Sequence, residues 1–212
     1  MSRILDPVER MSEVLFGLIM ALTFTGTISA ASSGNGEIRE ILIGALGCNI
    51  AWGLVDAVMY LLNTLTHRAR ALALTRRVRD AADTTGARGV IADALPEVLA
   101  KVVRPEELER LRQGVAQMKD LPARARLGGR DYLGALGVFL LVAVSTFPLV
   151  IPFLVMNDPV RALRFSHAAG LVLLFLVGHT LGRYSGLGGW RMGLSMIGIG
   201  VLLVVLTIAL GG

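Results

Sequence analysis

Two acidic side chains lie beside or inside long apolar stretches of this chain, where a carboxylate is costly to keep. Asp56 lies within the stretch Ile41–Thr66, about ten residues from its end, and Glu13 directly precedes the stretch Val14–Ala31. A charged side chain at the centre of a bilayer costs roughly 2.5–3.5 kcal/mol on insertion scales, so it needs a compensating partner. A divalent cation is one such partner, and a polar group on a neighbouring helix is another.

Glu13 also begins a stripe of small and hydroxyl residues at four-residue spacing, which continues through Gly17, Ala21, Thr25 and Ser29. On a helix these positions follow one side. Small residues at this spacing are typical of close helix packing in membranes, and packing accounts for the stripe as far as it goes. It does not account for the acid at the head of the stripe, which is either hydrated at the membrane interface or functional.

A second polar face surrounds Asp56. Its members recur at three- and four-residue steps and are Asn49, Gly53, Asp56, Tyr60 and Asn63, with Met59 close enough to share the face. Two interpretations remain open for Asp56. It is either a hydrogen-bonding clamp to a neighbouring helix or part of an ion site.

The ion-site interpretation requires the two acids and two methionines to converge. Carboxylate oxygens suit hard divalent ions, and thioether sulfur shifts the preference toward softer transition metals such as ferrous iron. The empty carboxylates would bind protons, which would couple metal and proton movement. The predicted metal ligands are Glu13, Asp56, Met59 and Met20. The predicted pathway-lining residues are Gly17, Ala21, Thr25, Asn49, Gly53 and Tyr60. His179 is the candidate proton relay.

Five apolar stretches must position these residues. They are Val14–Ala31, Ile41–Thr66, Tyr132–Asn157, Phe165–Gly182 and Met192–Gly212. Each reaches the roughly 20 residues that a helix needs to cross a ~30 Å hydrocarbon core. The sequence therefore predicts an all-α integral membrane protein with five transmembrane helices. Residues 1–66 would hold the first two helices, 67–130 a small helical insert, and 131–212 the last three.

The charge distribution orients this arrangement. Of the 21 Lys and Arg residues, 14 lie between His67 and Arg130, so the net charge of +5 reflects membrane topology rather than a nucleic-acid partner. The positive-inside rule places the amino terminus and the insert in the cytoplasm, and the carboxyl terminus on the opposite side. We expect the basic insert to contact anionic lipid headgroups.

Local signals predict the course of the insert and of the third stretch. We expect Arg68–Asp83 to continue the second helix, Thr84–Gly86 to break it, and a further helical segment near Val90–Val103. Pro105 suits a first helical position, followed by acids in the first turn. Pro148 and Pro152 remove backbone donors and should kink or break the third membrane helix.

The order of these parts resembles the vacuolar iron transporter family. The likeness lies in five spans with a cytoplasmic insert after the second, in the segment Glu13–Thr27, and in Phe147–Phe153. Family members carry an acid and then a run of small residues in span one, and a methionine and an acid in span two, to which Met59 and Asp56 correspond. The resemblance implies export of Fe²⁺ or Mn²⁺ from the cytosol by a homodimer, with the ion path and the subunit interface along the first helix.

The chain also differs from that family. The Gly-Glu-Tyr ending of its second span is replaced by the segment Asp56–Tyr60, and the insert is rich in arginine rather than in glutamate and methionine. Because the many Lys and Arg side chains of the insert repel metal cations, we do not expect the insert to bind metal.

Two functions remain open at this stage. The first is a proton-coupled transporter of divalent transition metal, in which the ion is cargo and no cofactor is needed. The second is a non-transporting membrane scaffold or regulatory protein, whose polar stripes only pack helices and whose insert binds lipid headgroups or a partner. We do not expect an enzyme, because Gly186–Gly189 lacks the strand and helix context of a phosphate loop.

Overall fold

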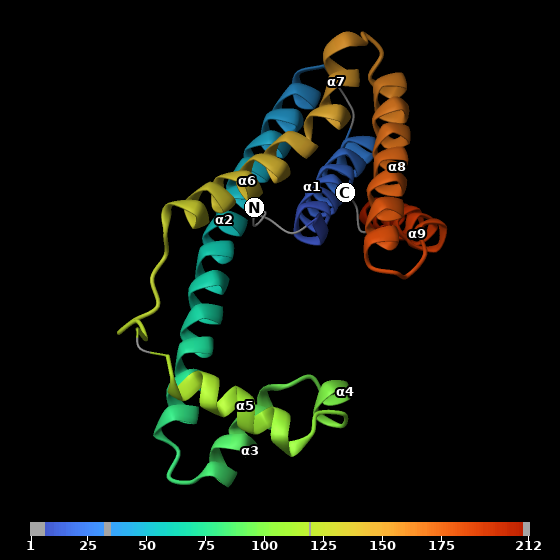
Figure 1. The fold of residues 1–212 in the computed structure, drawn as a ribbon. Coiled ribbons are helices and arrows are strands. Elements are labelled where there is room, and N and C mark those ends of the chain that lie inside the picture. The colour runs from blue at the N-terminus through green and yellow to red at the C-terminus, as the bar shows by residue number, and fades with distance from the viewer. Residues whose placement is uncertain (1–6, 32–34, 119, 210–212) are drawn as a thin grey trace. The chain divides into compact units, whose positions relative to one another are not determined.

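The computed structural model describes residues 7–31, 35–118 and 120–209, and within these ranges the side chains of residues 9, 26–31, 35–38, 40, 41, 159 and 208 stay outside the description. All regular elements in the described ranges are helices, as the sequence predicts (Figure 1). In chain order they are α1 (Pro7–Ala31), α2 (Asn35–Asp80), α3 (Thr84–Ala94), α4 (Glu97–Ala100), α5 (Pro105–Ala116), α6 (Gly129–Ser145), α7 (Phe147–Val155), α8 (Pro159–Tyr184) and α9 (Gly189–Ala209).

Four segments of the described chain are long and apolar enough to cross a membrane. They are Leu42–Asp80, Gly129–Val155, Val160–Tyr184 and Gly189–Thr207. These confirm the last four predicted spans as membrane-crossing candidates. α1 has 25 residues, about 37 Å at 1.5 Å per residue, but its side chains are described only as far as Thr25. The fifth span therefore stays a prediction.

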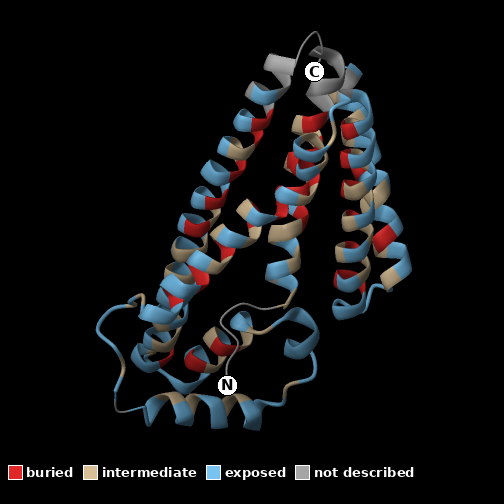
Figure 2. Cartoon of the chain, turned by 90° about the horizontal axis from the view of Figure 1, so that it is seen from above, coloured by how far each residue is buried: buried red, intermediate tan, exposed pale blue. Residues whose placement is uncertain are grey.

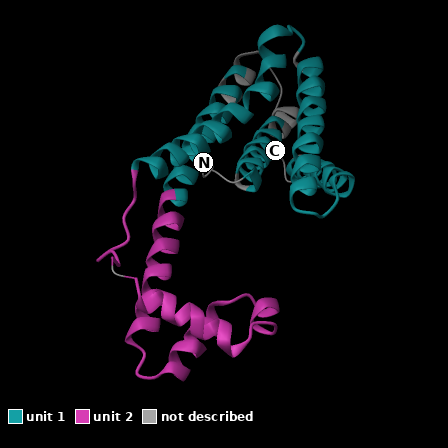
Figure 3. Ribbon diagram, in the orientation of Figure 1, with its two compact units in different colours: residues 1–60, 129–212 teal, residues 61–128 magenta. Residues whose placement is uncertain are grey.

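The chain divides into two compact units (Figure 3). Unit 1 comprises residues 1–60 and 129–212, and unit 2 comprises residues 61–128. Unit 2 nearly coincides with the insert expected at 67–130. α2 contributes to both units because it continues without a break to Asp80, close to the expected end at Asp83.

Unit 1 is built around α1, which contacts α6, α8 and α9. Its main core is wholly aliphatic and consists of Leu15, Leu18, Ala21, Leu22, Leu149, Leu174 and Leu181. Figure 2 shows buried residues recurring along one side of the unit 1 helices, while the other sides remain exposed. α8 and α9 pack closely because Gly178 and Gly182 on α8 face methionine side chains on α9. Exposed apolar sides are expected of helices that face lipid.

The third membrane segment is broken, as its prolines predict. α6 ends at Ser145 and α7 begins at Phe147, with Pro148 in its first turn. Proline has no N–H to donate into the preceding turn. Thr146, at the break, is completely buried and its carbonyl accepts from the backbone of Leu149 at 3.1 Å.

Unit 2 is a small helical assembly, in which the buried residues Val78, Ala87 and Ile91 form the core and Leu108 and Val115 pack against it. The expected break at Thr84–Gly86 is wrong in detail: α3 begins at Thr84, and the chain breaks just before it. The cause is Asp83, whose carboxylate accepts from the backbone N–H of Gly86 at 2.6 Å and caps α3.

α5 begins at Pro105 with two acids in its first turn, which confirms the prediction for this helix. Glu107 completes the start, because its carboxylate accepts from the backbone N–H of Arg104 at 2.9 Å. The expected segment Val90–Val103 is divided between the end of α3 and the short helix α4.

Candidate functional site

Asn49 joins three helical elements in the centre of unit 1. Its side chain is 1% exposed, and its amide Nδ2 donates to the carbonyl of Gly17 on α1 at 3.3 Å and to the hydroxyl of Thr146 between α6 and α7. An interhelical hydrogen bond inside a membrane contributes about 0.6 kcal/mol on average. Asn49 therefore fastens α1 and α2 to the proline break.

Glycine and tyrosine positions continue this contact along α2. A Cβ at Gly53 would lie 3.0 Å from the carbonyl oxygen of Phe139, so a larger residue here would push α2 and α6 slightly apart. Seven residues or about two turns further along α2, the ring of Tyr60 lies over Gly134 on α6, and a Cβ added at Gly134 would be 2.5 Å from the Tyr60 hydroxyl. Gly53 and Tyr60 are thus packed against α6, and Asn49 is bonded to α1 and to the break that follows α6.

The stripe on α1 is used in the same way. Gly17, Ala21 and Thr25 are all buried, and a Cβ at Gly17 would lie 2.0 Å from the hydroxyl of Ser145. Thr25 donates to the carbonyl of Ala21 within its own helix at 3.0 Å. Ser29 lies outside the described side chains. Within one chain the stripe makes helix contacts, and its role in lining a pathway stays a prediction.

Glu13 and Asp56 lie on nearly the same faces of α1 and α2 as Gly17 and Asn49, about 40° and 20° away around the respective helices. Phe16 on α1 and Trp52 on α2 meet edge to face, with ring centroids 5.9 Å apart, and both are partly exposed. The two helices run antiparallel (Figure 1), so residues after Trp52 are level with residues before Phe16. Glu13 lies three residues before Phe16, and Asp56 lies four after Trp52, about 4.5 and 6 Å along the respective axes. This register brings Glu13 and Asp56 to the same level.

The two predicted methionine ligands differ in position. Met59 lies two turns beyond Trp52 on the same side of α2, just past Asp56, and its side chain is 48% exposed. Met20 lies on the other side of Phe16, seven residues or about 10 Å from Glu13 along α1. Counted along the helix axes, Glu13, Asp56 and Met59 would lie near one level and Met20 about 10 Å from Glu13, and the convergence of the four ligands stays a prediction.

Asp56 is the most unusual member of this group. One of its carboxylate oxygens, Oδ2, is enclosed and has no hydrogen-bond partner. Buried polar atoms are normally paired, and an unpaired one is expensive in a bilayer. The clamp interpretation accounts poorly for this oxygen, because a clamp would give it a donor. Glu13 is half-buried and already makes an interaction of its own.

One chain offers too few donors for a complete ion site. Within the described residues, no group of three or more His, Cys, Asp or Glu side chains is placed to hold a metal ion. Glu13, Asp56 and Met59 would supply two carboxylates and one thioether. Mn²⁺ and Fe²⁺ prefer more ligands than this, so any site here needs additional donors.

His179 lies in an aromatic group at the carboxyl-terminal end of α8. Its ring is 5.8 Å from that of Phe175 and 5.7 Å from that of Trp190 on α9. Its Nδ1 atom is enclosed next to Gly189 and has no hydrogen-bond partner. The relay role stays a prediction, and the rings explain how the imidazole is held.

Sequence reasoning missed two structural arginines in unit 2. Arg68 donates to the carbonyl of Arg126 at 2.8 Å, and Arg76 donates to the carbonyls of Pro122 and Ala123 at 3.0 and 2.7 Å. These bonds hold the irregular segment after α5 against the end of α2. In the sequence these arginines look like ordinary surface charge, because the carbonyl groups that accept their hydrogen bonds lie far away along the chain.

Comparison with known proteins adds no identity. No protein-family model matches the chain, and no curated protein matches it at significant similarity.

Proposed function

We propose that the chain is one subunit of a dimeric membrane transporter that moves a divalent transition-metal ion, Fe²⁺ or Mn²⁺, out of the cytosol in exchange for protons. The supporting observation is Asp56, a carboxylate in a membrane-spanning helix with an enclosed and unpartnered oxygen. A passing cation would stabilise that oxygen, and a proton would do so in the empty state.

A second copy supplies the donors that one chain lacks. A two-fold dimer formed through the side of α1 and α2 that carries Phe16 and Trp52 would bring together four carboxylates and two thioethers, from Glu13, Asp56 and Met59 of each copy. Such a set fits Mn²⁺ or Fe²⁺. The small-residue stripe of α1 is buried within the chain, so this interface replaces the one along the stripe that the family resemblance implies.

Proton exchange follows from the same carboxylates. A metal ligand must be deprotonated, so binding of the ion displaces the protons that neutralise Glu13 and Asp56 in the empty site. The ion would enter from the cytoplasm, because Glu13 and Asp56 lie toward the amino-terminal end of α1, which the positive-inside rule assigns to that side. α1 completes a five-span topology in this proposal, with unit 2 in the cytoplasm against anionic headgroups.

The first test is metal binding by the purified full-length protein, followed by the electron paramagnetic resonance signal of free Mn²⁺. We expect wild type to remove Mn²⁺ from solution with one ion per two chains, and Glu13→Gln and Asp56→Asn to lose this binding. Asp158→Asn is the matched control, because Asp158 caps α8 outside the group and asparagine also caps. Equal binding by all four proteins, or none by wild type, would refute the proposal.

A membrane scaffold is the second candidate, and one observation favours it. Gly17, Asn49, Gly53 and Tyr60 serve helix packing in the structure. On this view unit 2 binds headgroups or a partner, and Asp56 has no transport role. Absence of Mn²⁺ binding together with a fixed co-purifying protein would favour the scaffold.

A further inference from the structure

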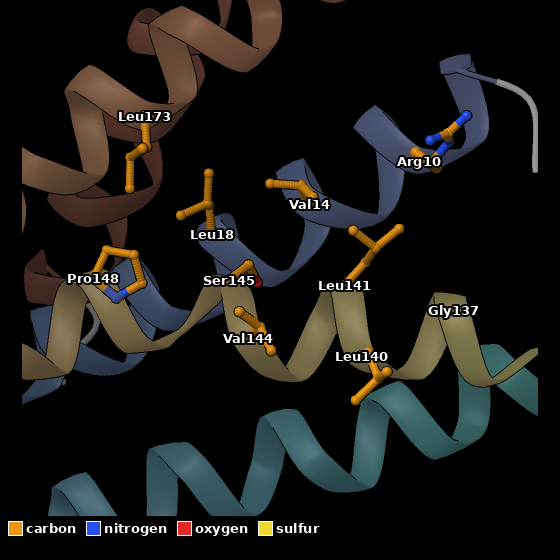
Figure 4. Close-up of a pocket in the computed structure, with 10 residues that line it drawn as sticks. All are labelled: Arg10, Val14, Leu18, Gly137, Leu140, Leu141, Val144, Ser145, Pro148 and Leu173. Carbon is orange, nitrogen blue, oxygen red and sulfur yellow. The ribbon is translucent and has the colours of Figure 1, made fainter.

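A long apolar groove lies on the opposite side of α1 from Phe16. It has a volume of about 540 Å³. α1 forms its floor, α6 and the start of α7 form one wall, and Leu173 of α8 contributes to the other (Figure 4). The lining residues are Arg10, Val14, Leu18, Gly137, Leu140, Leu141, Val144, Ser145, Pro148 and Leu173. Leu140 and Val144 are about half exposed, so the groove opens on the surface of unit 1.

The apolar lining fits a hydrocarbon chain along most of the groove. Eight of the ten lining residues are apolar or glycine. Ser145, one of the other two, donates its hydroxyl to the carbonyl of Val142 at 2.7 Å, so this polar group is already used inside α6. The groove runs from Gly137 on α6 to Pro148 in the first turn of α7, about 16 Å at 1.5 Å per residue, which suits an extended chain rather than a compact ligand.

Arg10 makes the two ends of the groove different. It is the only charged residue of the lining, and it lies at the end formed by the first turns of α1 (Figure 4). Arg10 already makes one interaction of its own, and its guanidinium, a planar group with five N–H donors, has further donors that match phosphate geometry. An occupant with a long apolar tail and an anionic phosphate at one end satisfies both parts of the groove.

We propose that this groove binds one anionic glycerophospholipid, with an acyl chain against α1 and α6 and the headgroup phosphate at Arg10. The apolar tail gains little from leaving other lipid tails, because the bilayer is as apolar as the groove. Selectivity therefore comes from the headgroup, where one arginine favours an anionic lipid over a neutral one by roughly fivefold. The proposal needs unit 1 to lie in a bilayer and is independent of metal transport.

Native mass spectrometry of the full-length protein tests it, with phosphatidylglycerol and phosphatidylcholine of the same acyl chains titrated in turn. We expect wild type to retain phosphatidylglycerol about fivefold more strongly. Arg10→Gln should remove that preference, and Arg191→Gln, an exposed arginine on α9 outside the groove, should keep it. Val144→Trp should weaken retention of both lipids, because the exposed Val144 allows a larger side chain to fill the groove.

Several results would overturn the proposal. Equal retention of the two lipids by wild type would show only the surrounding lipid layer. An equal effect of Arg10→Gln and Arg191→Gln would place the selectivity elsewhere. A dimeric wild type together with a monomeric Val144→Trp would identify the occupant as a second copy, and retention of added oleate in place of phosphatidylglycerol would identify it as a free fatty acid.

Discussion

Replacing Gly17 by alanine tests whether the small-residue stripe of α1 contributes to stability by allowing close helix packing. The added Cβ would lie 2.0 Å from the hydroxyl of Ser145 and 3.0 Å from the carbonyl oxygen of Val142. Ser145 must then turn its hydroxyl away from the Val142 carbonyl, to which it donates at 2.7 Å, and α1 must move slightly away from α6.

The expected cost is the balance of three effects. Overpacking a close contact costs about 1–3 kcal/mol. Loss of the Ser145 hydrogen bond adds about 0.6 kcal/mol, and the better helix propensity of alanine returns about 1 kcal/mol. Together these terms predict that Gly17→Ala lowers the free energy of unfolding by about 0.6–2.6 kcal/mol. Gly17→Ala combined with Ser145→Ala should recover about half of this loss, because the nearest clash is with the removed hydroxyl.

The assay is reversible unfolding by SDS in mixed micelles, followed by circular dichroism. Gly44→Ala is the matched control, because no atom lies within 4 Å of a Cβ built there. It should be neutral or stabilising. The packing argument is refuted if Gly17→Ala is no more destabilising than Gly44→Ala, or if Ser145→Ala gives no recovery.

Three further predictions concern single contacts. Asn49→Ala should cost about 1–3 kcal/mol in the same unfolding assay, because two interhelical bonds are lost and a cavity remains; a neutral effect would remove its role as a fastening residue. Asp83→Ala should cost about 1 kcal/mol of unit 2 stability while Asp83→Asn costs little, and equal losses would contradict the capping role. The hydrogen bonds from Arg112 and then Gln113 lower the pKa of Glu109 to about 2. The contact of the ionised Glu109 carboxylate with Arg112 therefore contributes fully at pH values above the usual carboxylate pKa, and it is lost only as the pH falls through about 2. In Arg112→Gln the carboxyl pKa should rise toward 4.5 in a carbon-13 NMR titration, and an unchanged value would assign the shift to another group.

Much of the fold follows from local sequence signals. The apolar stretches, the proline pair in the third segment and Pro105 with its acids each act through neighbouring residues, and the structure agrees for the last four stretches, for the proline break and for the start of α5. The start of α3 was displaced because Thr84–Gly86 resembles a turn, while the Asp83 cap lies just ahead of it.

The site was harder to predict because it depends on how the helices are rotated about their axes. Spacing places Gly17, Asn49 and Gly53 on polar or small faces, but it does not tell a pathway from a close contact. Met59 lies one turn from Asp56 on the same helix, whereas the distances of Glu13 and Met20 from Asp56 depend on the register of α1 and α2. That register is set by the Phe16 and Trp52 rings, which carry no polar signal in the sequence.

Transport of Mn²⁺ into proteoliposomes loaded with a Mn²⁺-sensitive dye is the most direct test of the central claim, that Glu13 and Asp56 carry a moving cation. The account predicts flux by wild type and by Asp158→Asn, and a loss of tenfold or more in Glu13→Gln and in Asp56→Asn, since even indirect metal-site partners affect activity by about 10–100-fold. The same flux in all four proteins, at equal reconstituted amounts, would contradict it.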